Sequence, residues 1–401
     1  MTQLDPHAAG FRVSAPRLLR ATLAATALLD ELTTGLLVVG LPLVRDTLHL
    51  SYDQAGFLFT AGALSSLLLE PGINLASDRA SKRLPILVGM LCLVAAFLLA
   101  ASAPSFALLL LACGVLFPAN GAAVGLAQAA LVDASTALGR TMTRWTIMSG
   151  IGDLLAPLAV GAGVALGLGW RELCLGAAAL WLAAVLVLVP QRFPRFARAN
   201  VEDEPAWQPL WAVVRSALRN RELLRWVAIS LLATTLDEVY LAFAALYLHD
   251  RLGVSQEVIG VVIALALGTG LLALVALDRL QLRVAGRRLL PWMALTALAG
   301  VVVFLLAPNA LVAALGLAVT ALGAIGWYPV AKAAAYAILP GRSGLVRAVA
   351  MLGAPFEIAL PGAVGLIAAR FGLGAGIGFL ALGPLVMLLL LPRQRRSSRP
   401  A

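Results

Sequence analysis

Charged residues are scarce in this sequence, and their scarcity excludes an ordinary soluble protein. Only 12% of the 401 residues are charged and 61% are apolar, against about 25% and 45–50% in soluble globular domains. A water-soluble fold would have no means of hiding that much apolar surface. The composition therefore predicts an integral membrane protein.

Cysteine and histidine are also rare, with three residues of each type. Cys92, Cys113 and Cys174 lie in apolar runs without metal-ligand spacing, which indicates packing residues rather than redox or metal chemistry. The histidines fall in the N-terminal tail and in the predicted outer loops, so none is a midplane proton carrier. No H-E-x-x-H motif and no nucleophile with a neighbouring base is present, which excludes an intramembrane enzyme. We expect neither a metal nor another cofactor.

Long apolar runs fill most of the chain. A bilayer core of about 30 Å requires about 20 mostly apolar helical residues. The sequence has twelve such runs, at 18–44, 52–77, 84–102, 105–133, 143–168, 171–190, 223–248, 255–277, 288–307, 309–339, 344–370 and 372–391. The predicted fold is all-α, with twelve transmembrane helices in two pseudo-symmetric six-helix bundles.

One polar stretch interrupts this pattern near the middle of the chain. It separates an N-terminal bundle over residues 1–190 from a C-terminal bundle over residues 223–401, and we interpret residues 191–222 as a cytoplasmic linker. Its second part carries Trp207, Trp211 and Arg215 in an amphipathic pattern, which predicts a position at the lipid headgroups.

The basic residues predict the orientation of the chain. With both termini in the cytoplasm, 25 of the 30 Lys and Arg residues fall on the cytoplasmic side, as the positive-inside rule requires. No cleavable signal is visible, and we expect the first helix to direct insertion into the cytoplasmic membrane. The net charge of +10 is spread over the inner helix ends rather than gathered in one patch, which excludes nucleic-acid binding.

An internal repeat relates the two halves. Four features recur at offsets of 200 to 207 residues, which predicts parallel repeats about an axis along the membrane normal. The pairs are Leu29-Asp30-Glu31 with Leu236-Asp237-Glu238, Asp78-Arg79 with Asp278-Arg279, Asp153 and Pro157 with Glu357 and Pro361, and Gln128 with Lys332.

The loop after the second predicted helix carries a family resemblance. Its sequence, from Asn74 to Arg83, resembles the G-x-x-x-D-R-x-G-R-R motif of the major facilitator superfamily, with Asn74 and Ser81 in place of glycines. The resemblance implies a transporter in which Asp78, Arg79, Lys82 and Arg83 latch the cytoplasmic gate. The fifth helix, with Gly152, Pro157 and Gly161, is similar to the antiporter branch. Phe117 stands where the proton-coupled drug antiporters of this family have an arginine.

Acidic residues near the bilayer midplane are the best candidates for a functional site, because a carboxylate in hydrocarbon is costly and usually faces a cavity or a partner. The predicted substrate- or proton-binding set is Asp30, Glu31, Thr34, Asp237, Glu238, Tyr240, Lys332 and Glu357. Adjacent helical residues point about 100° apart, so we assign the cavity-facing role to Asp30 and Asp237. Burial favours the neutral form of a carboxyl group, so these acids are candidate proton carriers; permanently protonated acids that join helices are the alternative.

Other charged residues are predicted to serve the gate or the interface between halves. This set is Glu70, Asp78, Arg79, Lys82, Arg83, Asp153, Asp278 and Arg279, with Pro157 and Pro361 in the gating helices. We expect Asp133, near a helix end, to be solvated. Lys332 either extends to the cytoplasmic surface or neutralises an acid or an anionic group of a substrate.

The expected function is secondary active transport of a small solute by alternating access, coupled to protons and directed outward. A passive facilitator, an uptake symporter and a non-transporting receptor remain alternatives, whereas a channel would need repeated filter segments that the sequence lacks. Several acids with one lysine favour a cationic or zwitterionic solute. We expect a monomer in the lipid bilayer, with no nucleic-acid partner.

Overall fold

The computed structural model describes residues 16–50, 52–79, 81–135, 137–193, 210–236, 238–254 and 256–391. Within these ranges every regular element is helical. In chain order the elements are α1 (Arg17–Val39), α2 (Leu41–Leu48), α3 (Tyr52–Arg79), α4 (Arg83–Ala101), α5 (Phe106–Asn120), η1 (Gly121–Gly125), α6 (Leu126–Asp133), α7 (Leu138–Ala165), α8 (Trp170–Leu188), α9 (Leu210–Arg219), α10 (Arg221–Leu232), η3 (Ala233–Leu236), α11 (Glu238–Leu252), α12 (Gln256–Leu280), α13 (Gly286–Leu305), α14 (Ala310–Ala324), α15 (Trp327–Ile338), α16 (Ser343–Ala350), η4 (Met351–Gly353), α17 (Ala354–Phe371), α18 (Leu373–Leu380) and α19 (Leu382–Leu390).

These helices form the predicted membrane passages. In the described part of the chain, ten helical stretches are long and apolar enough to cross a bilayer. Two further long helices, α1 with 23 residues and α3 with 28, carry the acids Asp30, Glu31 and Glu70. Together they account for the twelve helices expected from the apolar runs.

Several of the membrane-spanning stretches are interrupted by a short turn of π- or 3₁₀-helical geometry. A π-helical turn, η1, joins α5 to α6 and consists of five small or β-branched residues. In the passage formed by α16 and α17, the 3₁₀ turn η4 ends at Gly353, and Pro355 follows in the first turn of α17. Proline is favoured at the start of a helix because its missing N–H is not needed there. Such interruptions are tolerated in membranes where neighbouring groups satisfy the backbone.

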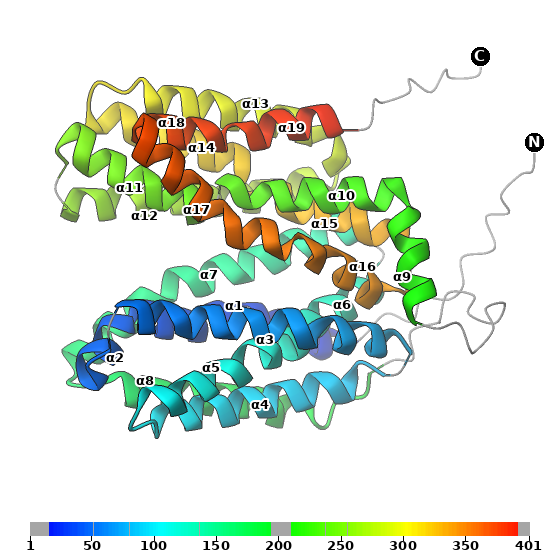
Figure 1. Ribbon diagram of the computed structural model, residues 1–401. Helices are drawn as coiled ribbons and strands as arrows, with labels where there is room; N and C mark the ends of the chain where they lie inside the picture. The colour runs from blue at the N-terminus through cyan, green and yellow to red at the C-terminus, as the bar shows by residue number, and fades with distance from the viewer. Residues whose placement is uncertain are drawn as a thin grey trace, which may run out of the picture. The chain divides into compact units, whose positions relative to one another are not determined.

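The chain divides into two compact units. The first contains residues 1–220 together with 335–352, and the second contains 221–334 and 353–401. In the first unit α1 packs along α7 and α8, α4 along α5 and α8, and α3 along α5 (Figure 1). The late segment α16 packs in this unit against α3, α6 and α9.

The second unit repeats much of this order of neighbours. Here α13 packs along α14, α18 and α19, as α4 packs along α5 and α8, and α12 packs along α14, as α3 packs along α5. The seam between α13 and α14 is close because glycines lie at it: a Cβ on Gly300 would overlap Thr320, and one on Gly316 would overlap Phe304. Small residues at a helix crossing let the two backbones approach.

Large apolar side chains cover much of the outer surface. Leu68, Leu366 and Leu389 are 72%, 75% and 84% exposed, and many other leucines and valines are exposed with them. In water such a surface would drive aggregation, whereas lipid tails solvate it. The molecule is a multi-pass membrane protein.

Candidate functional site

Asp30 is the centre of a small polar cluster in the first unit. It is the fourteenth of the 23 residues of α1, which places it near the middle of that helix. Its Oδ1 accepts a hydrogen bond from the side-chain amide of Asn120, at the end of α5. The hydroxyl of Thr34, one turn further along α1, donates to the same oxygen at 3.3 Å. Both donors are neutral.

Glu31, the neighbour of Asp30, points to a different helix. Its Oε1 accepts a hydrogen bond of 2.7 Å from Ser149 of α7. The contact is possible because Gly152, one turn along α7, allows the helices to approach: a Cβ there would meet the Leu28 carbonyl oxygen and the Glu31 side chain. The structure therefore separates the two acids, with Asp30 facing α5 and Glu31 facing α7.

Phe117 lies on the α5 side of the same region. Its ring packs on Gly62 of α3, where an added Cβ would overlap it. Together with Thr34 it lines a small cavity whose other walls are apolar, formed by Leu37, Val44, Leu58, Leu109, Cys113 and Leu116. An apolar ring thus forms this wall of the cavity.

Glu70 forms an ion pair that lies against the π-helical turn η1. Its Oε2 lies 3.6 Å from an Nη atom of Arg347 in α16, and both side chains are largely buried. Arg347 also donates from Nε to the Asn74 side-chain oxygen at 3.3 Å. The glycines of η1 accommodate this pair, since a Cβ on Gly121 would overlap the Glu70 carboxylate and one on Gly125 would overlap the Arg347 guanidinium.

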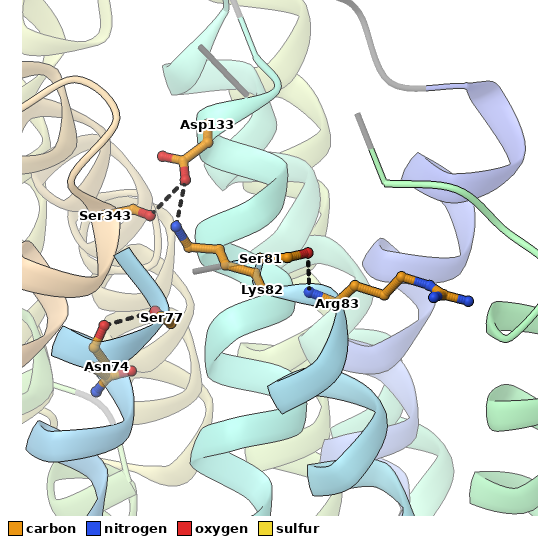
Figure 2. A network of polar contacts seen from close by, with 7 residues as sticks. All are labelled: Asn74, Ser77, Ser81, Lys82, Arg83, Asp133 and Ser343. Carbon is orange, nitrogen blue, oxygen red and sulfur yellow. Dashed lines mark hydrogen bonds and ion pairs between the residues drawn. The ribbon is translucent and has the colours of Figure 1, made fainter. Parts of the chain in front are cut away.

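A second ion pair lies at the end of α6, and Figure 2 shows it. Lys82 Nζ is 2.8 Å from Asp133 Oδ2, and the side chains are only 7% and 4% exposed. The Ser343 hydroxyl donates to the same oxygen at 3.0 Å. The expectation that Asp133 is solvated is therefore wrong, because Lys82 and Ser343 replace water around its carboxylate.

Arg83, next to Lys82, points the opposite way in Figure 2. Its backbone N–H donates to the Ser81 hydroxyl at 3.3 Å, and its guanidinium donates to the Val189 carbonyl at the end of α8. Adjacent basic residues of the motif thus hold different helices, with Lys82 on α6 and Arg83 on α8.

Two charged residues of the predicted site lie in the second unit. Lys332 of α15 is buried, and its ammonium lies 5.2 Å from the centre of the Tyr328 ring. The same ammonium acts electrostatically on the carboxylate of Glu357, which lies on the exposed face of α17. The structure thus places both residues in one unit, near enough for their charges to interact.

Tyr240 lies elsewhere, in the packed interior of the second unit. Its hydroxyl is 3.3 Å from that of Thr320, and its ring packs edge-on against Phe304. With 1% exposure, it joins α11 to the seam of α13 and α14.

The remaining predicted residues are placed as follows. Asp153 is exposed on α7, and Asp278 and Arg279 lie in the last turn of α12. Pro157 and Pro361 lie inside α7 and α17. Asp237 and the side chains of Glu238, Asp78 and Arg79 lie outside the described residues.

Sequence reasoning missed the neutral and basic partners of the acids. Asn120, Ser149 and Asn74 are uncharged, so no energetic cost marked them in the sequence. Arg347 stood within the predicted helix 344–370 but was counted only as a residue that sets orientation. Its position inside an apolar run was the signal that could have identified it.

Buried acids with polar partners, on helices arranged in two units of recurring order, define a class of helical membrane protein with an intramembrane polar site. The sequence matches the Major Facilitator Superfamily over residues 23–356. The chain therefore belongs to this family of transporters.

Solved structures show the same fold. A structure of the fucose:proton symporter of E. coli has a TM-score of 0.78 at 14% identity, covering 93% of this chain and 97% of that one. A human organic anion transporter has a TM-score of 0.73 at 17% identity, covering 94% and 99%. A proton:xylose symporter has a TM-score of 0.71 at 14% identity, covering 93% and 94%. No curated protein sequence matches the chain.

Proposed function

We propose that this protein is a proton-coupled carrier of a small solute, in which Asp30 accepts and releases the coupling proton. The observation that carries the proposal is the set of contacts around Asp30. Two neutral donors, Asn120 and Thr34, hold its carboxyl group, and no ion pair among the described residues includes it. A carboxylate so placed is neutralised by a proton or by a cationic solute.

Three other acids in the described helices of the first unit have side-chain partners. Glu70 is paired with Arg347, Asp133 with Lys82, and Glu31 accepts from Ser149. Each of these contacts joins two helices, which is a structural task as well as an electrostatic one. Asp30 is therefore the acid best suited to change its charge during the transport cycle.

Two of the similar structures are titled proton symporters, while the motifs of α7 resemble the antiporter branch. At 14% identity the structures show the fold alone, so proton coupling is inferred from Asp30 itself. We propose that the carrier acts in the cytoplasmic membrane. Its direction is read from the same experiment that tests coupling.

The test uses vesicles that contain the purified protein and a trapped pH dye. Gradients of sugars, amino acids, amines and organic anions are imposed one at a time. We expect at least one solute to drive proton movement through the wild type, and Asp30→Asn to abolish it. The sign of the pH change distinguishes symport from antiport.

Asp250→Asn is the matched control, because Asp250 is an exposed acid near the end of α11. It should move protons as the wild type does. A solute that crosses at equal rates through the wild type and Asp30→Asn, without proton movement, would show that the carrier is passive.

A further inference from the structure

Asn120 occupies a junction between Asp30 and a turn of unusual geometry. It is the last residue of α5 and directly precedes η1, while its side-chain amide donates to Asp30. A primary amide carries both a donor and an acceptor. By rotating about its last side-chain bond, Asn120 can therefore donate to a carboxylate or accept from a carboxylic acid. The two rotations match an Asp30 that accepts as a carboxylate and an Asp30 that donates its O–H as a carboxylic acid.

The turn that follows Asn120 is packed on both sides. On α4, Gly89 lies against the backbone of Ala119, Ala122 and Ala123. On the other side, Gly121 and Gly125 lie directly against the side chains of Glu70 and Arg347. With no side chain to absorb a displacement at either glycine, movement of the turn is passed to the ion pair. π-Helical turns are rare and occur frequently at functional sites.

Arg347 belongs to a segment that the turn and α6 hold in the first unit, residues 335–352, here called the clasp segment. Its contacts with α6 come in sequence order: Tyr336 donates to Gln128 at 3.2 Å, and Ser343 donates to Asp133 at 3.0 Å. On either side of the clasp segment the chain continues into the second unit. This short segment is therefore joined covalently to the second unit at both of its ends.

We propose that Asn120 is a positioning residue that couples the charge state of Asp30 to the hold of the first unit on the clasp segment, through η1. When Asp30 takes up a proton, Asn120 changes from donor to acceptor, the turn shifts, and the contacts of Gly121 and Gly125 with Glu70 and Arg347 change. The proposal rests on the proposed function, in that Asp30 is the group that takes up the proton.

Several charged groups surround this pathway, and the test must separate them. Glu31 lies beside Asp30 on α1, Glu70 faces it from α3, and Arg347 faces Glu70 from α16. Asp133 of α6, which is paired with Lys82 just before α4, holds Ser343 in the middle of the clasp segment. A pH response of the clasp segment is therefore informative only when it is compared between variants at Asp30 and Asn120.

The experiment measures hydrogen–deuterium exchange of the clasp segment in the full-length protein, reconstituted in lipid nanodiscs without solute. Exchange is followed across a pH series and corrected for the pH dependence of the chemical exchange rate. We expect a step in the exchange of residues 335–352 in the wild type. Asp30→Asn should remove the step, because the residue at position 30 then stays neutral.

The decisive comparison is between the two donors to Asp30. Asn120→Leu should remove the step although Asp30 is intact, whereas Thr34→Val should keep it, with a shifted midpoint, because Thr34 lies on α1 and has no link to η1. Asn120→Ala is a second variant that should also lose the step if Asn120→Leu folds poorly, because it removes the amide without adding a titratable group. Each variant is first checked for thermal stability.

The outcomes separate the two proposals. A step that persists in both Asn120 variants but disappears in Asp30→Asn would overturn the role of Asn120 and leave the proton site in place. A step that persists in Asp30→Asn would overturn the coupling altogether, whereas proton movement in the vesicle assay is judged independently. A wild type without any step would also reject the inference.

Discussion

Asp30 and Glu31 are adjacent in the chain, yet their neighbours differ in kind. Asp30 meets an amide that can donate or accept, and Glu31 meets a hydroxyl on α7. The angle of about 100° between successive helical side chains separates them. A substitution at position 30 should therefore act differently from one at position 31, although both residues are acids in the middle of one helix.

Substitutions at Glu31 test this separation. Gln at position 31 keeps an oxygen that accepts from Ser149, so we expect Glu31→Gln to retain both thermal stability and solute-driven proton movement. Glu31→Ala leaves the Ser149 hydroxyl without this acceptor and should lower the free energy of unfolding by about 1–3 kcal/mol. Thermal unfolding and the vesicle assay provide the measurements. Loss of proton movement in Glu31→Gln, as in Asp30→Asn, would mean that the two acids act together.

Gly121 is a second position where a single added carbon atom should change the stability. Gly121→Ala would place a Cβ in the Glu70 carboxylate, and overpacking of this kind costs about 1–3 kcal/mol. Gly114→Ala, in the preceding helix α5, meets nothing within 4 Å and should be neutral or stabilise by up to about 1 kcal/mol, the helix preference of alanine over glycine. Unfolding temperatures of the two variants, measured side by side, should differ in this order. Equal unfolding temperatures would show that the turn accommodates the added Cβ without loss of stability.

At the scale of the helices, sequence reasoning located the passages and missed their interruptions. A run of about 20 apolar residues is enough to predict a helix in a bilayer, and the described helices follow those runs. The π-helical geometry of Gly121–Gly125 depends on what packs against it, because small residues suit an α-helix equally well in sequence. The acids of the site could be predicted from the sequence, because a carboxylate in hydrocarbon is energetically costly. Asn120 and Ser149 gain their roles only from tertiary contacts.

The pair of Lys82 and Asp133 joins the start of α4 to the end of α6. Asp133 lies at a helix C-terminus, where the helix dipole disfavours a negative charge, so its stability depends on Lys82 and Ser343. We expect Lys82→Met or Asp133→Leu alone to lower the free energy of unfolding by about 3–5 kcal/mol, because the remaining charge stays buried after its ion-pair partner is removed.

The double substitution Lys82→Met with Asp133→Leu should recover most of that loss, since an apolar pair of similar volume replaces the ions. Denaturant unfolding of the four proteins in detergent gives the coupling energy directly. A double variant as unstable as the sum of the single variants would mean that the pair is not coupled and that each charge has its own partner.

Across the whole molecule, the two units share the order in which their helices pack, but the charges around their acids differ. In the first unit, Gln128 accepts from Tyr336, whereas its counterpart in the repeat, Lys332, is a cation that acts on Glu357. Asp30 has neutral partners, whereas Glu357 has a basic one. A duplicated fold therefore presents two different chemical environments, with neutral donors around Asp30 in the first unit and a cation that acts on Glu357 in the second.

This asymmetry predicts a rescue that is specific to the second unit. Lys332→Met removes the buried cation that acts on the Glu357 carboxylate, so we expect a lower yield of folded protein and a lower unfolding temperature. Adding Glu357→Gln should restore both, because the negative charge that Lys332 offsets is then removed as well. Asp30→Asn should need no such second change, since its partners are neutral. Size-exclusion profiles and unfolding temperatures of the four proteins test this. If the double variant at positions 332 and 357 is no better than Lys332→Met, Glu357 does not depend on Lys332, and the second unit holds its acid by other means.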